Sequence, residues 1–434
     1  MVTEPAALPS ACDNALVGEL ESFLCNLVAE MTPEPLPTHR RGRPPILPAL
    51  ALWAGLLVCV LRGFSAQLAL WRLLHERGIW NFPRFPVSDQ AVYARLARAG
   101  TAPLEAFLDK VTAALKERLK PAMDTRLAPF ATEVVALDSS TLDQIRRKLP
   151  ELRGIPKGDG RLLPGKLQSI FDLRRQLWRT ISFAAADQND KRDARELAST
   201  LPKGSLILAD LGYFGFAWFD WLTDQDYFWV SRLRGKTSYR IIHCYYAQGT
   251  TFDGLVWMGA YRADQAGHAV RLVSFQVGQQ TFRYITNVLN PKQLPPLTLA
   301  KLYARRWDIE MAFQLIKQHL GLHLLWSSKP VVVQQQVLAV LIISQVLQAL
   351  RLEIACRAGV DPFDVSLPLF IQYAPWYASQ GRDPVQAFVE AGRELRFIRP
   401  SRRTAIRAPA LPEAWVPIPP DMVLHRTPRH AGRL

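Results

Sequence analysis

The 434 residues are 49% hydrophobic and 21% charged, which is typical of a folded globular protein and excludes a disordered chain; two or three domains are expected at this length. Lys and Arg outnumber Asp and Glu by 53 to 38, a formal net charge of +15, so the expected partner is a polyanion, either nucleic acid or an anionic membrane surface. The five cysteines are scattered without a Cys-x-x-Cys pair, which excludes a zinc knuckle or a disulfide framework and favours a reducing cytoplasm.

The first part of the chain, to about residue 125, is predicted to be helical because apolar residues recur at spacings of three and four. Its N-terminus lacks the basic and then apolar pattern of a secretory signal. The apolar run at residues 46–61 contains Pro48 and is shorter than the about 20 residues of a spanning helix, so a buried core helix is predicted. A second apolar run, residues 331–350, is interrupted by three glutamines and is predicted to be a core helix too. No membrane association is therefore expected.

Residues 65–78 and 87–100 have the pattern of a helix-turn-helix, with Ser88 predicted to cap the second helix. Four side chains of that helix would be available to a DNA groove or backbone: Gln90, Tyr93, Arg95 and Arg98. A plain helical hairpin with a basic face explains the same residues. Upstream, the sequence Arg-Gly-Arg-Pro at residues 41–44 resembles a minor-groove hook.

From Glu133 the pattern changes to short apolar runs bounded by turn residues, which predicts strands. These runs cover residues 133–138, 166–173, 177–187, 205–210 and 227–233. Short helical patterns precede and follow the fourth run, so an α/β fold with a mixed sheet is expected. Residues 236–290 contain four consecutive strand patterns, which predicts an all-β insertion. A long helix over residues 299–319 follows, with Thr298 as its predicted N-cap, and the chain is then helical to about Ala358.

The strongest local signal lies in the predicted helix 299–319. Tyr303, Arg306, Glu310 and Lys317 stand at offsets of 0, 3, 7 and 14, and at about 100° per residue they project from one stripe. An acid between two cations and a phenol suits a metal-binding carboxylate beside side chains that grip phosphate. An ordinary solvated helix face is the alternative for this helix taken alone.

Two aspartates close apolar strand patterns upstream of that helix. Asp138 follows Val-Val-Ala-Leu, and Asp210 follows Leu-Ile-Leu-Ala. Such a carboxylate is costly to desolvate unless a cation or hydrogen-bond donors meet it. With Glu310, the two could hold a pair of divalent ions about 4 Å apart. Aspartates that cap the following turns are the alternative. Other nearby acids are less suited, because they lie beyond a turn, on an edge or on a helix: Asp143, Asp172, Asp220, Asp224 and Asp226.

These residues together resemble the bacterial insertion-sequence transposases of the DDE class, in particular the group with the signature Tyr-x2-Arg-x3-Glu-x6-Lys, which in this chain is Tyr303, Arg306, Glu310 and Lys317. The resemblance covers residues 130–325 and implies a ribonuclease-H-like catalytic domain, with Asp138 on its first strand and Asp210 on its fourth. It also implies two Mg²⁺ ions at the three acids, with Mn²⁺ as a substitute, and contacts from the other signature residues to DNA near the scissile phosphate. Many members have Asp-Arg-Gly-Tyr at the second acid, whereas this chain has Leu211 in place of the arginine.

The predicted organisation has three parts: a helical N-terminal DNA-binding domain in residues 1–125, the catalytic domain in residues 126–325 with its β-rich insertion at 236–290, and a helical, basic C-terminal region in residues 326–434. In related transposases an aromatic residue of the insertion can stack on a flipped base; Trp257 is the candidate in this sequence, and a core position in a strand is the alternative. The arginine-rich residues 393–407 favour a DNA or partner contact, with a solvated basic tail as the alternative.

The expected function is that of an insertion-sequence transposase of the bacterial cytoplasm and nucleoid, acting as a homodimer on paired DNA ends. It would bind terminal inverted repeats, cut them, and transfer the 3′ ends to target DNA by two-metal phosphoryl transfer. Three alternatives remain: a catalytically inactive DNA-binding descendant, a nuclease of the same fold without strand transfer, and a membrane-associated protein based on residues 46–61, which recovery in the soluble fraction without detergent would exclude. Metal-dependent cleavage distinguishes the first, and joining of a labelled 3′ end distinguishes the second.

Overall fold

A computed structural model describes residues 18–29, 46–64, 66–142, 165–184, 190–261, 263–322, 324–401 and 406–430. The predicted minor-groove hook at residues 41–44 and Asp143 lie outside these ranges. The chain divides into two compact units, each assembled from separate segments of sequence. The first unit comprises Met1–Ala122, Thr141–Gly165 and Ala312–Pro400, and the second comprises Met123–Ser140, Lys166–Met311 and Ser401–Leu434. The three-part division by function remains a prediction.

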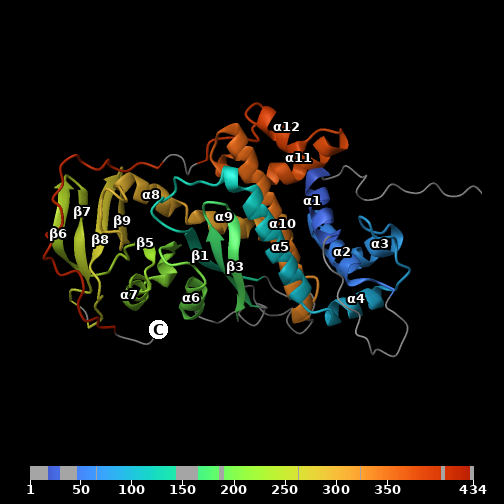
Figure 1. Cartoon of the computed structure of the whole chain (residues 1–434), viewed down its shortest axis with the longest axis horizontal. Helices are drawn as coiled ribbons and strands as arrows, with labels where there is room; N and C mark the ends of the chain where they lie inside the picture. Colours follow the sequence, from blue (N-terminus) through green and yellow to red (C-terminus); the bar gives the residue numbers. More distant parts are fainter. Residues whose placement is uncertain are drawn as a thin grey trace, which may run out of the picture. The chain divides into compact units, whose positions relative to one another are not determined.

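The second unit is built on one nine-stranded sheet with the order β3-β2-β1-β4-β5-β9-β8-β7-β6 (Figure 1). Its strands are β1 Val134–Thr141, β2 Lys166–Asp172, β3 Leu177–Ala184, β4 Leu206–Ala209, β5 Phe228–Arg232, β6 Tyr239–Gln248, β7 Thr251–Met258, β8 Val270–Val277 and β9 Gln280–Thr286. Strands β1, β4 and β5 run parallel, whereas β2 with β3 and the series from β5 through β9 to β6 pair antiparallel. The predicted mixed α/β fold is confirmed. The four strands of the predicted insertion are present, and they extend the same sheet through the pairing of β9 with β5.

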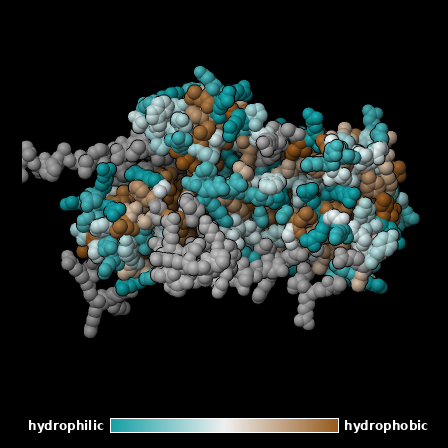
Figure 2. Space-filling model, turned by 180° about the vertical axis from the view of Figure 1, so that it is seen from behind, coloured by the Kyte–Doolittle hydropathy of each residue, from teal (hydrophilic) through white to brown (hydrophobic). Residues whose placement is uncertain are grey.

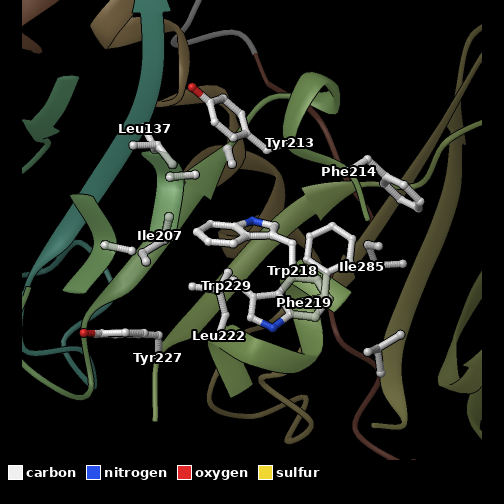
Figure 3. Close-up of a cluster of buried hydrophobic side chains, with 14 of the residues drawn as sticks. Leu137, Ile207, Tyr213, Phe214, Trp218, Phe219, Leu222, Tyr227, Trp229 and Ile285 are labelled. Carbon is white, nitrogen blue, oxygen red and sulfur yellow. The ribbon is translucent and has the colours of Figure 1, made fainter. Parts of the chain in front are cut away.

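Two helices, α6 Asp190–Ser199 and α7 Phe216–Asp224, lie beside each other in Figure 1 and contribute to the main core of this unit. Side chains of α7 pack onto β1, β4 and β5 (Figure 3), and the rings of Phe219 and Trp229 stack with centroids 4.2 Å apart. This aromatic core holds the parallel strands in place, and the two predicted aspartates lie on or directly after two of these strands.

The C-terminal residues 406–430 run as an extended segment along the insertion strands. Val416 donates its backbone N–H to the carbonyl of Tyr245, and Arg426 donates to the carbonyl of Gly267. The segment therefore packs with the second unit, although its sequence predicted only a loop-rich, basic region.

The first unit is helical. Its helices are α1 Gly18–Ala29, α2 Ala49–Leu61, α3 Gln67–Glu76, α4 Asp89–Arg98, α5 Ala102–Arg118, α10 Pro330–Ala358, α11 Leu367–Ser379 and α12 Pro384–Glu390. Helix α10 packs against α2 and α5. It is long and apolar enough to cross a membrane, but 94% of its apolar window is buried inside the protein. On the face seen in Figure 2, hydrophobic residues form small groups among hydrophilic ones. Both apolar runs are core helices, as predicted.

The predicted helix-turn-helix segments are helices α3 and α4, and the predicted N-cap of α4 is confirmed, because Ser88 Oγ accepts a hydrogen bond from the backbone N–H of Ala91 at 3.2 Å. The other end of α4 is held by a glutamine of α10. Gln335 Nε2 donates to the carbonyls of Leu96 and Gly100 at 2.9 and 2.7 Å. The glutamines that interrupt the apolar run of α10 therefore include one that satisfies backbone groups at a helix end.

The prediction of one continuous helix over residues 299–319 is wrong. Helix α8 spans Pro296–Ala304, helix α9 spans Trp307–Gln314, and a π-helical turn follows at Leu315–His319. Residues 305 and 306 form a tight turn, with backbone hydrogen bonds from Arg305 to Leu302 and from Arg306 to Tyr303. Thr298 is not the N-cap, which is Pro295; Pro296 begins the helix, because proline lacks the N–H that a first helical residue leaves unpaired.

Candidate active site

The first two predicted acids are neighbours because two parallel strands are in register. Leu137 of β1 pairs with Ala209 of β4, and each is followed by an aspartate, Asp138 and Asp210. Asp210 directly follows its strand, as predicted. Asp138 ends the apolar run but not the strand, since β1 continues through Thr141. The two carboxylates therefore lie at the same edge of the sheet.

The third acid approaches them through an arginine. Arg306 Nη1 donates to Glu310 Oε1 at 2.5 Å, and Arg306 Nε lies 4.0 Å from Asp210 Oδ1. The arginine is almost completely buried, at 5% exposure, whereas the side chains of Asp210 and Glu310 are 49% and 29% exposed. A buried cation thus lies between two partly open carboxylates, and its charge offsets their mutual repulsion.

The electrostatic environment of Asp138 includes Arg306 and the other two acids. Burial raises the pKa of the Asp138 carboxyl from 3.8 to about 6. The hydrogen bond from the Ser139 N–H and the charge of Arg306 lower this pKa, while the charges of Glu310 and Asp210 raise it further. A bound cation would favour the ionised form of this carboxyl. The Ser139 N–H that binds Asp138 belongs to the next residue of β1, so Asp138 does not cap a turn as the alternative interpretation expects. The Asp210 side chain makes no capping hydrogen bond to the helical turn that follows it within the described chain.

Two signature residues carry buried polar atoms without a hydrogen-bond partner among the described residues, the Tyr303 hydroxyl and Arg306 Nε. Burial raises the pKa of Tyr303 to about 12, so its hydroxyl remains a donor at physiological pH, and the nearby charges of Arg306 and Arg232 lower that pKa only in part. Buried polar groups normally have partners, so unpaired donors beside a carboxylate cluster are suited to an incoming anion such as a phosphate.

Comparison with known proteins bears on this site. The sequence profile of the family described as "Transposase DDE domain" matches residues 129–346, which is half of the 434 residues and includes all three acids. The chain belongs to the DDE transposase family.

A protein of Sinorhizobium fredii (strain NBRC 101917 / NGR234) that is named as a transposase, y4zB, is 24% identical to this DDE family member over 206 residues, or 46% of this chain. The chain spans 57% of the length of that curated relative. Among solved structures, a piggyBac transposase synaptic complex with hairpin DNA matches 90% of this chain and 84% of its own, at 10% identity and a TM-score of 0.38. A TM-score this low supports no conclusion about the fold of this family member.

The residues of this transposase domain suit a divalent cation in their chemistry. Three carboxylates supply hard oxygen ligands, the kind that Mg²⁺ and Mn²⁺ prefer. Their present arrangement is not a finished metal site, because no group of three His, Cys, Asp or Glu side chains in the described ranges converges closely enough to hold an ion. Arg306 instead occupies the space beside Glu310 and Asp210. A cation bound by all three acids would lie beside the Arg306 guanidinium and would draw Glu310 away from it.

The remaining predicted contact residues lie in different settings. Lys317 is in the π-helical turn of the first unit, where its Nζ donates to the carbonyl of Thr141. Trp257 lies on β7 and is buried, with 6% exposure. The guanidinium carbon of Arg426 lies over its ring, 4.5 Å from the ring centre. That is the core position stated as the alternative. On α4, Gln90 and Arg98 are exposed, whereas Arg95 is half-buried.

Sequence reasoning missed two arginines of the transposase domain. Arg232, at the exposed end of β5, lies close enough to lower the pKa of Tyr303. The available signal was the alternation of charged and apolar residues, with Arg232 and Arg234 on either side of Leu233. Arg305 was overlooked because it directly precedes Arg306 of the predicted signature. A helical pattern places adjacent residues on different faces, but it does not indicate which residues they contact.

Proposed function

We propose that this chain is a DNA transposase that cuts and joins strands by metal-dependent phosphoryl transfer, with Asp138, Asp210 and Glu310 as its catalytic acids. The observation that carries the proposal is geometric: Asp138 and Asp210 follow paired residues of β1 and β4, and Arg306 bonds to Glu310 and approaches Asp210, although the three acids are far apart in sequence. The family membership and the name of the Sinorhizobium relative support the same activity.

The proposed domain is ribonuclease-H-like. In support, the sheet contains the strand order β3-β2-β1-β4-β5, with the first acid on β1 and the second directly after β4. Four antiparallel strands then precede α8 and α9, so Glu310 enters the site from a helix that follows the insertion.

Divalent ions held by the three acids would supply Lewis-acid stabilisation of the transferred phosphoryl group and a more acidic nucleophile. The chain's own residues would bind and orient the DNA strand. Once separated from Glu310, Arg306 can donate two parallel hydrogen bonds to a phosphate, and the unpaired Tyr303 hydroxyl can donate a third. Arg232 would add positive charge beside them.

DNA recognition would use further residues of both units. The net charge of +15 favours binding to a polyanion. Gln90 and Arg98 are both exposed on the short helix α4, whose beginning is fixed by the Ser88 cap, so both are available to a DNA groove or backbone. Arg95 and Lys317 remain proposed contacts to the backbone. Trp257 could stack on a base only if Arg426 moved away from its ring. The proposal also includes that two copies of the chain act as a homodimer that binds paired terminal inverted repeats.

The test uses a duplex with the inverted repeats that flank the coding sequence, incubated with Mg²⁺. The wild-type protein should nick the repeat end and join a labelled 3′ end to plasmid DNA, whereas Asp138→Asn, Asp210→Asn and Glu310→Gln should do neither. The matched control is Asp226→Asn, since Asp226 is an exposed acid paired with Lys203 and asparagine tolerates its positive φ of 61°. Cleavage that survives in the three variants would falsify the assignment, and cleavage without joining would indicate a nuclease.

A further inference from the structure

The turn between α8 and α9 separates two adjacent arginines that have different partners. Arg306 pairs with Glu310 and approaches Asp210. Arg305 Nε donates to Asp308 Oδ2 at 2.7 Å, and its Nη2 donates to the carbonyl of Leu173 at 2.9 Å. The second arginine thus belongs to a separate network, outside the carboxylate cluster.

The centre of that network is a fully buried carboxylate. Asp308 is 0% exposed, and its Oδ2 accepts hydrogen bonds from Arg305 and from Gln176 Nε2, the latter at 2.8 Å. A buried aspartate is costly to desolvate unless it is paired and hydrogen-bonded, so its position depends on both donors. Asp308 is therefore held firmly at the beginning of α9, two residues before Glu310.

Gln176 connects this network to the turn between β2 and β3. Its side chain is also fully buried, it donates to the carbonyl of Leu173 at 3.1 Å, and its backbone has a positive φ of 57°. A left-handed backbone at a residue other than glycine is strained, and the two hydrogen bonds that the amide nitrogen donates help to hold it in this turn.

The same turn is hydrogen-bonded to the strand of the first acid. Leu173 donates its backbone N–H to the carbonyl of Val134, the first residue of β1, at 2.9 Å. A continuous series of hydrogen bonds thus runs from the beginning of α9, through the β2–β3 turn, to the strand that carries Asp138.

We infer that Arg305, Asp308 and Gln176 are positioning residues that hold α9 at a set place relative to β1, so that Glu310 and Arg306 face Asp138 and Asp210. We call these three residues the α9 clamp. The clamp touches neither DNA nor metal; it acts through the helix it holds. This inference rests on the proposed function, because it assigns a role in assembling that site.

The test is Arg305→Lys. Lysine keeps the charge but lacks the planar fork that reaches Asp308 and Leu173 together. We expect Mn²⁺ binding, followed by electron paramagnetic resonance, and single-turnover cleavage each to weaken by about tenfold, as is common for residues that orient metal ligands. DNA affinity, which depends on surface charge, should stay within about twofold of wild type. Hydrogen exchange of peptides covering Trp307–Gln314 should accelerate.

A matched control exists in the same unit. Arg271 is fully buried, donates to both Asp253 oxygens and also donates to the carbonyl of Leu294, so Arg271→Lys makes an equivalent change in a different ion pair. It should lower Tm as Arg305→Lys does, yet leave Mn²⁺ affinity and exchange in α9 unchanged. All assays are run well below the Tm of both variants.

A second variant covers the case in which Arg305→Lys does not fold. Gln176→Asn tolerates the positive φ, but its shorter amide cannot reach Asp308, so it should accelerate exchange in α9 and weaken Mn²⁺ binding in the same direction. Unchanged exchange in α9 in the folded clamp variants, or an equal change in Arg271→Lys, would overturn the inference. Hydrogen exchange needs neither DNA nor metal. An inactive wild-type protein would therefore refute the proposed function, whereas exchange in α9 would still show whether the clamp holds that helix.

Discussion

Arg306 donates a hydrogen bond to Glu310 one helical turn away, at 2.5 Å, and the same guanidinium lies 4.0 Å from Asp210. The cation therefore occupies the place where a divalent ion would be attracted by the same two carboxylates. Under the proposed function, arginine and metal would compete for Glu310, and DNA would resolve this competition by offering Arg306 a phosphate instead.

Replacing Arg306 by methionine should separate metal binding from catalysis. Without the competing cation, we expect Mn²⁺ to bind the DNA-free protein about threefold to tenfold more tightly, because two carboxylates lose their internal partner. Cleavage should fall by about a hundredfold, since the phosphate loses a charged donor. Electron paramagnetic resonance and a single-turnover assay measure the two effects. Arg179→Met, which removes an arginine paired with Glu133, is the control, and weaker Mn²⁺ binding in Arg306→Met would contradict the competition.

The raised pKa of Asp138 predicts a dependence of stability on pH. The folded protein takes up this proton near pH 6 and the unfolded chain near 3.8, so ionisation of Asp138 destabilises the fold progressively as the pH rises from about 4 to about 6. In metal-free buffer, Asp138→Asn should raise the free energy of unfolding by at most about 3 kcal/mol above pH 6, and by nothing below pH 4. Urea denaturation at several pH values measures the difference. A gain that is equal at pH 4 and pH 7 would show that the buried charge of Asp138 is not its cause.

The same group should set the lower pH limit of metal binding. A protonated carboxyl is a poor ligand, so the apparent affinity for Mg²⁺ should decrease as the pH falls through about 6. Cleavage at subsaturating Mg²⁺ should decline over this range, and saturating Mg²⁺ should move the decline to lower pH. A profile that is insensitive to the Mg²⁺ concentration would show that another group titrates.

Tyr303→Phe should have opposite effects on folding and on activity. The hydroxyl is buried without a hydrogen-bond partner among the described residues, so its removal should be neutral or stabilise the protein by up to about 1 kcal/mol. Cleavage should decrease about tenfold if the hydroxyl donates to the DNA phosphate. Calorimetry and a single-turnover assay make the comparison. Full activity in a stabilised variant would show that the Tyr303 hydroxyl takes no part in cleavage.

Arg98→Ala tests the role of α4 in DNA binding. If this exposed side chain contacts a phosphate, its loss should weaken binding for all sequences and reduce the slope of log affinity against log salt by about 0.9. Filter binding over a range of salt concentrations measures that slope. Arg357→Ala, an exposed arginine in the last turn of α10, provides the comparison, and an equal change in both variants would indicate only general electrostatics.

Local sequence patterns identified most of the elements that build the site. The apolar runs before Asp138 and Asp210 predicted β1 and β4, because strands buried on both faces are apolar throughout. That the two aspartates are adjacent depends on the parallel register of Leu137 with Ala209, which no local pattern contains. The break at Arg305 could not be predicted either, since apolar periodicity continues through it. At the break Arg305 binds Asp308, three residues further on, and the carbonyl of Leu173, which is far away in the sequence.

By itself, the sequence determined most of the helices and strands and their order, the likeness to a transposase family and the candidate acids, because burial periodicity and residue chemistry are local properties. Only the tertiary structure decided that Trp257 is buried under Arg426, that residues 312–400 pack with the N-terminal helices, and that residues 406–430 pack with the sheet. These outcomes depend on contacts between residues far apart in the chain, and such contacts are chosen by the packing of the whole unit.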